Sequence, residues 1–256
     1  APSRGLGDVY KRQIMNNPMF SNINENQDAV YSKSDCASYK GITIKTLILL
    51  FVSIASAAAA IASLYTGVGT NVLLSVLIGS GILGFITVLI GRMSPRASAV
   101  CGILYAIGEG AFLGALSLLL NLVYEGIALV AIISTIVVFC AMLGVFASGI
   151  IRNKSKIYSF TVTLGISLIL MALVMLIMSI FPVFNSIMNN LGVMIAVEAL
   201  FIIYACAMLL TNFNEAQELV KGGCDKSYEW CCAFGLLISI LYICLLYTSP
   251  SPRDGA

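Results

Sequence analysis

Seven long apolar runs constrain the fold of this 256-residue chain more than any other feature. A helix needs about 20 predominantly apolar residues to cross the hydrocarbon core of a bilayer. Helices are the structure expected in lipid, because an open strand there would leave backbone groups without hydrogen-bond partners. The predicted spans are Thr43–Leu64, Asn71–Ile90, Ser98–Leu120, Ile127–Ile150, Phe160–Phe181, Asn190–Thr211 and a seventh that begins at Trp230.

The composition agrees with a polytopic membrane protein. Hydrophobic residues make up 59% of the chain and charged residues only 10%, whereas soluble domains usually carry about 25% charged residues. The surface of a water-soluble fold could not be built from such a chain. The sequence therefore predicts an all-α fold, a bundle of seven transmembrane helices in contact with the lipid bilayer.

The two ends of the chain encode a common DNA element. When Cys244–Asp254 (CLLYTSPSPRD) is back-translated, the reverse complement encodes Ser3–Gln13 (SRGLGDVYKRQ). We therefore interpret residues 1–13 and 244–256 as a translated sequencing adapter, which is excluded from fold reasoning. Residues 14–41 are then a flexible cytoplasmic tail, and residues 42–243 are the membrane domain, with its last helix truncated.

The formal net charge of +2 gives no basis for an acidic partner. Four of the 14 basic residues and two of the 12 acidic residues lie in the two presumed adapter segments, so the rest of the chain is balanced in charge. We expect no nucleic-acid partner.

Basic residues occur in every second connection between the predicted spans. Because positive loops face the cytoplasm, this alternation predicts a cytoplasmic N-terminus and a seventh span that ends on the far side. The residues are Lys33, Lys40 and Lys45 around the start of the first span, Arg92 and Arg96, then Arg152, Lys154 and Lys156, and finally Lys221 and Lys226.

The third span repeats small residues at every fourth position. Gly102, Ala106, Gly110 and Gly114 lie on one helix face, and such a stripe lets a neighbouring helix approach closely. We expect this helix to be central to the bundle.

Only two charged residues lie deep within predicted spans, Glu109 and Glu198. At 1.5 Å per residue they lie about 16 Å and about 20 Å from the cytoplasmic ends of their helices. One hypothesis is that they share a proton in an ion pathway, because a charged residue inside the membrane is costly and marks a functional site. The alternative is that each is protonated or hydrogen-bonded and only joins helices.

Soluble-type catalysis has little support. The chain has no histidine, and its eight cysteines form no CxxC pair, which removes common zinc sites and Ser/His or Cys/His nucleophiles. No Walker A pattern is present. We expect no enzyme activity, no metal and no cofactor.

The segment Leu209–Gly223 (LLTNFNEAQELVKGG) is predicted to be a solvated helix end capped at Gly222.

Four segments together resemble the Bax inhibitor-1 family, in its bacterial YccA-like branch. They are NNPMF near the start, YAIGEGAFLGALS in the third span, TNFNEAQELVKGG after the sixth and YEWCCAFGLLISILY in the seventh. The resemblance implies a seven-helix bundle in the inner or plasma membrane and a role in ion transport and stress response. In some members it implies a pH-sensitive calcium leak.

In those members, two acidic residues on the last two helices pair as a proton-sensing gate. The resemblance places the first at Asn212, followed by Phe213 and Asn214, where the branch often has acid-Phe-acid. It places the second around Leu245 or Leu246. Asn keeps the shape of Asp but cannot titrate, so the gate is expected to lose its pH switch. Glu109 matches the family's third-span Glu.

Two functions follow as competing hypotheses. The first is a passive leak for calcium or another cation through the bundle. The second is a non-conducting regulator that binds another membrane protein, such as a membrane-bound protease. The Asn-rich tail (Asn16–Asp35) and the small-residue stripe suit the second hypothesis equally well.

Overall fold

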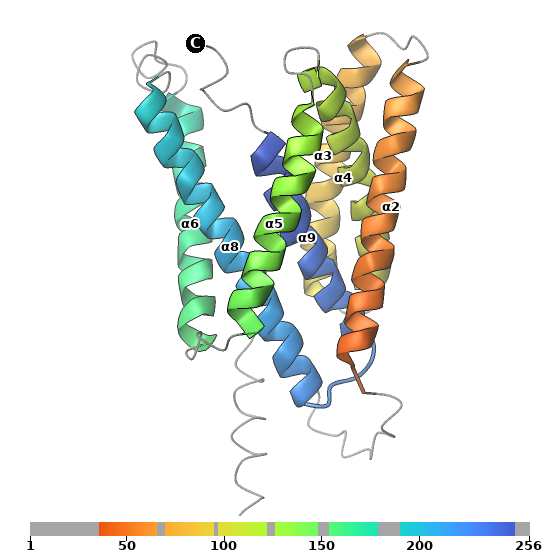
Figure 1. Ribbon diagram of the computed structural model, residues 1–256, viewed down its shortest axis with the longest axis vertical. Coiled ribbons are helices and arrows are strands. Elements are labelled where there is room, and N and C mark those ends of the chain that lie inside the picture. Colours follow the sequence, from red (N-terminus) through yellow and green to blue (C-terminus); the bar gives the residue numbers. More distant parts are fainter. Residues whose placement is uncertain are drawn as a thin grey trace, which may run out of the picture. The chain divides into compact units, whose positions relative to one another are not determined.

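Seven α-helices make up most of the part of the chain that the computed structural model describes, namely residues 36–65, 70–94, 97–121, 126–147, 154–178 and 190–248. All seven are long and apolar enough to cross a membrane, and these ranges contain no strand. The predicted fold class is confirmed. The helices are α2 (Tyr39–Tyr65), α3 (Thr70–Met93), α4 (Ser98–Asn121), α5 (Ile127–Ala147), α6 (Lys154–Met178), α8 (Leu191–Lys221) and α9 (Tyr228–Thr248) (Figure 1).

Several helix ends differ from the predicted spans. α2 begins at Tyr39 rather than Thr43, and α6 begins at Lys154 rather than Phe160. α9 runs through Ile243 to Thr248, while the assignment of residues 244–256 to an adapter stays a prediction. The expectations for residues 1–35 lie outside the described residues.

α8 continues past Thr211, the predicted end of the membrane span, to Lys221, next to the predicted cap at Gly222. Phe213, Ala216 and Leu219 on this extension are buried, so it is not the solvated helix end that was predicted. Polar residues lower the local hydropathy here, yet they do not interrupt the helical hydrogen bonds.

Gly223, rather than Gly222, takes the left-handed conformation at the end of α8, with φ of 64°. The Cys224 N–H donates to the Leu219 carbonyl (3.2 Å) and the Gly223 N–H to the Val220 carbonyl (3.3 Å). This pair of bonds is a Schellman motif, which closes a helix with glycine in the position after the cap. It turns the chain toward α9.

The chain divides into two compact units, and both α8 and α9 run through the two. The first unit includes α2, α3, most of α4, the end of α8 and the start of α9 as far as Leu237. Its core is built around Phe234, which is fully buried and meets Tyr105 edge to face at 5.5 Å. A methyl group on Gly91 would overlap the Phe234 ring, so glycine there makes room for the aromatic side chain.

The second unit comprises Ser117–Phe213 and the chain from Ile238 onward. Phe213 of α8 contacts Phe139 and Phe146 of α5, with ring centroids 5.8 and 5.4 Å apart. A hydrogen bond of 3.0 Å between Thr161 and Thr211 joins α6 to α8. Aromatic packing and one buried hydroxyl pair therefore hold α8 against its neighbours in this unit.

α9 is the most enclosed of the spans. Residues buried inside the protein make up 56% of its membrane window, compared with 33% for α4 and between 11 and 22% for the other five. The helix expected to be central, α4, comes second. The sequence signal for α4 was its small residues, whereas α9 is buried through large side chains such as Phe234 and Leu237.

Candidate functional site

The small-residue stripe of α4 lies against α2. A methyl group at Gly110 would overlap the Ser53 carbonyl of α2, and one at Gly114 would lie 2.6 Å from the Ala57 carbonyl oxygen. Gly102 faces Leu49 of α2. Ala106, between these glycines, is fully buried.

The Ser56 hydroxyl adds a hydrogen bond of 2.7 Å to the Ile107 carbonyl. Close backbone approach of this kind replaces the hydrophobic driving force that helices lack inside a bilayer. Because α2 covers the stripe, the stripe is not an open surface for another protein.

Glu109 is half-buried on α4. One of its carboxylate oxygens would lie 3.2 Å from a methyl group built on Gly84, and the Tyr105 ring lies beside the same glycine. The carboxylate therefore lies where α3 and α4 meet in the first unit. Glu198 is also half-buried, on the part of α8 that belongs to the second unit. The shared proton between these two residues stays a prediction.

Asn212 makes its contact with α9 through a hydroxyl group. Its amide Nδ2 donates to Ser239 Oγ at 2.6 Å, and the two residues are 3% and 0% exposed. Ser239 lies about one helical turn after Gly235, whereas Leu245 lies about 9 Å further along the helix than Ser239 at 1.5 Å per residue. The contact thus occurs earlier on α9 than the family resemblance implied.

Asn214, the second residue at the family gate position, lies in the first unit. It is buried, and among the described residues its Nδ2 has no hydrogen-bond partner. An unsatisfied buried amide is costly. Asn214 is therefore not part of the Asn212–Ser239 contact.

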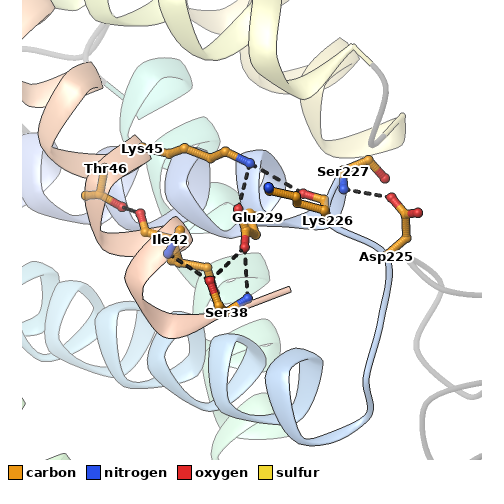
Figure 2. A network of polar contacts seen from close by, with 9 residues as sticks. Ser38, Ile42, Lys45, Thr46, Asp225, Lys226, Ser227 and Glu229 are labelled. Atoms are coloured by element: carbon orange, nitrogen blue, oxygen red, sulfur yellow. Dashed lines mark hydrogen bonds and ion pairs between the residues drawn. The ribbon is translucent and has the colours of Figure 1, made fainter. Parts of the chain in front are cut away.

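A polar cluster that the sequence did not predict forms around Glu229, in the first turn of α9 (Figure 2). This side chain is 1% exposed. Its Oε1 accepts hydrogen bonds from the backbone N–H (2.8 Å) and the hydroxyl (3.1 Å) of Ser38. Its Oε2 forms an ion pair with Lys45 Nζ at 2.8 Å. A buried charge is tolerated when it is paired and hydrogen-bonded in this way.

The ammonium group of Lys45 makes three contacts. Besides the carboxylate, its ammonium group donates to the Lys226 carbonyl at 3.4 Å and lies 5.1 Å from the centroid of the Trp230 ring. Such a cation–π contact adds to the ion pair. Lys45 therefore joins α2 to the start of α9.

The segment before α2 pairs with the connection between α8 and α9. Ala37 N–H donates to the Cys224 carbonyl at 2.8 Å, and Cys36 forms an isolated antiparallel bridge with Asp225. Hydrogen bonds from Ser227 hold the pKa of the Asp225 carboxyl below its usual range. The pKa of the Cys224 thiol is raised, mainly because the thiol is buried and also because Cys36 and Asp225 lie nearby. The start of α2 and the α8–α9 connection therefore lie at the same end of the first unit.

No group of three or more His, Cys, Asp or Glu side chains that could hold a metal ion occurs in the described ranges.

A family model described as "Bax inhibitor 1 like" matches residues 17–248. The chain belongs to the Bax inhibitor-1 family. The match includes all seven helices, so the family resemblance and the multi-pass membrane character are confirmed. Searches among curated proteins and among solved structures gave no match.

Proposed function

We propose that this Bax inhibitor-1 family member is a passive leak for calcium or another cation, and that an uncharged contact closes it. The observation that carries the proposal is the buried hydrogen bond between Asn212 and Ser239. The leak recorded for some members that the chain resembles suggests the transport class, and Glu109 supplies a carboxylate within a span. We also propose that the protein belongs to the YccA-like branch and acts in transport rather than catalysis.

The chemistry of the contact determines how it responds to pH. Amide and hydroxyl groups do not change charge between pH 5 and 8, whereas a pair of carboxylates can lose or gain a proton in this range. A helix contact made by Asn212 and Ser239 is therefore as strong at pH 5 as at pH 8. Any remaining pH dependence of the leak would come from carboxylates elsewhere, of which Glu109 and Glu198 lie within the spans.

The orientation that we propose is a cytoplasmic N-terminus in an inner or plasma membrane. The hydrogen bond between Ala37 and Cys224 places the start of α2 and the α8–α9 connection at one end. Basic residues lie around both segments, with Lys40 before the first long apolar run and Lys221 and Lys226 near the second segment. The positive-inside rule puts such an end in the cytoplasm.

Calcium flux into proteoliposomes across pH 5 to 8 tests the proposal. We expect a calcium leak whose rate changes little between pH 5 and 8, because the Asn212–Ser239 contact does not titrate in this range. The variant Asn212→Asp should make the rate depend on pH, since it adds a titratable group, while Ser239→Ala should raise the leak at every pH. Glu109→Gln should reduce the flux.

The shared-proton hypothesis makes a separate prediction for the same assay. If Glu109 and Glu198 share a proton, both Glu109→Gln and Glu198→Gln should remove whatever pH dependence the unmodified protein retains. A protein that is impermeable to calcium at every pH would instead support the non-conducting regulator of a membrane partner. The stripe on α4 gives no help to that alternative, because α2 covers it.

A further inference from the structure

The first turn of α2 lacks a capping acid of its own. Ser38 is the N-cap residue, and its hydroxyl accepts the Gly41 N–H at 3.0 Å. In a capping box, a Glu or Gln three residues after the N-cap reaches back to the N-cap N–H. That position is Gly41 here, and it has no side chain. The Ser38 N–H is satisfied instead by Glu229, which is 191 residues away in the sequence.

Gly41 is what lets Glu229 take this role. A methyl group on Gly41 would overlap the Glu229 carboxylate, so even alanine would displace it. The carboxylate thus occupies the place that the side chain of a local capping acid would fill. It also lies at the positive ends of two helix dipoles, since it caps α2 and stands in the first turn of α9.

The neighbours of the carboxylate fit only its ionised form. The Ser38 N–H, the Ser38 hydroxyl and the Lys45 ammonium all donate to it. A protonated Glu229 would bring a further donor to this place and leave the Lys45 charge, which is 15% exposed, without its counter-ion. The cluster is therefore suited to hold α2 and α9 together through an ionised Glu229, rather than to respond to pH.

We propose that Ser38, Gly41 and Glu229 form a capping box shared between α2 and α9, so that the start of α2 stays ordered only while the start of α9 is docked on it. A second hydrogen bond at this segment, from the Ala37 N–H to the Cys224 carbonyl, also joins it to the α8–α9 connection. Displacement of the first turn of α9 removes the Glu229 bonds to Ser38, whereas Cys224 belongs to the turn that closes α8. The shared box thus makes release of the first turn of α2 a direct consequence of movement at the start of α9.

Hydrogen–deuterium exchange of the full-length protein in lipid nanodiscs tests this coupling without measuring transport. In Gly41→Ala we expect amides 38–42 to exchange roughly tenfold faster than in the unmodified protein, because the carboxylate that caps this turn is displaced. Exchange within α4 should not change. Gly81→Ala on α3 is the matched control, since a methyl group there meets no atom within 4 Å.

Two further variants separate the shared box from a simple ion pair. Ser38→Ala removes only the cap hydroxyl and should speed the same amides by roughly threefold, even if Gly41→Ala does not fold. Lys45→Met removes the ion pair and leaves the Ser38 bonds to Glu229, so its effect on these amides should be smaller than that of Gly41→Ala. The proposal is overturned if Ser38→Ala leaves amides 38–42 as protected as before, or if Lys45→Met alone releases them.

Discussion

Replacing Glu229 with Gln should be among the most damaging single changes in the first unit. The substitution keeps the shape of the side chain and removes its charge. Oε1 can still accept from Ser38, but the amide nitrogen that replaces Oε2 is a donor facing the donor Lys45. The variant therefore leaves a largely buried ammonium group without a counter-ion.

The size of the effect follows from the burial of the two partners. Removal of one partner of a buried ion pair costs about 3 to 5 kcal/mol. Lys45 is 15% exposed and keeps its contacts with the Lys226 carbonyl and the Trp230 ring, so part of its charge stays solvated. We therefore expect a loss near the lower limit, about 3 kcal/mol, which corresponds to roughly a 150-fold change in the unfolding equilibrium.

Trp230 gives a built-in optical reporter for this experiment. It is the only tryptophan of the chain and lies against Lys45. Its fluorescence during SDS-induced unfolding in mixed micelles should report the stability of the cluster. Glu229→Gln should unfold at clearly lower SDS than the unmodified protein.

The double variant Lys45→Met with Glu229→Gln is the decisive control. Once both charges are gone no unpaired ion remains, so the double variant should be more stable than Glu229→Gln alone. The reasoning fails if Glu229→Gln lies within about 0.5 kcal/mol of the unmodified protein, a change typical of an ordinary surface position. It also fails if the two single effects simply add in the double variant.

Two further predictions concern packing and pH. Gly110→Ala should destabilise the protein by about 1 to 3 kcal/mol, because its methyl group would overlap the Ser53 carbonyl. In the same SDS titration Gly79→Ala, where a methyl group meets no atom within 4 Å, should change little. The lowered pKa of Asp225 means that its bonds with Ser227 stabilise the fold above the unfolded-state pKa, and this contribution is lost as the pH falls through the lowered value. An unfolding midpoint measured from pH 7 to pH 2 should therefore fall less steeply in Asp225→Asn, and an identical pH profile in both proteins would contradict the assignment.

The membrane fold could be predicted from the sequence because hydropathy alone determines it. A chain with so many long apolar runs can satisfy its backbone in lipid only by forming helices. The α4 stripe was equally readable, since side chains four residues apart share a helix face whatever the rest of the fold does. These features depend on local spacing.

The polar contacts were not readable because their partners are far apart in the sequence. Nothing near Glu229 indicates that it caps a helix beginning at Tyr39, and Gly41 matters only through the carboxylate that takes its side-chain space. The glycines after Lys221 did predict where α8 ends. Its burial was not predicted, because the polar residues from Thr211 onward suggested a solvated segment, whereas Phe213, Ala216 and Leu219 are buried.

The shared box between Ser38 and Glu229 also has a consequence for biosynthesis. The ribosome makes α2 first among the described helices and α9 last, so the Ser38 amide waits for its acceptor until nearly the whole chain has been made. A chain terminated before α9 would keep a frayed leading helix that proteases can attack. In this protein, the first turn of α2 is therefore capped only after α9 has been made and has packed against it.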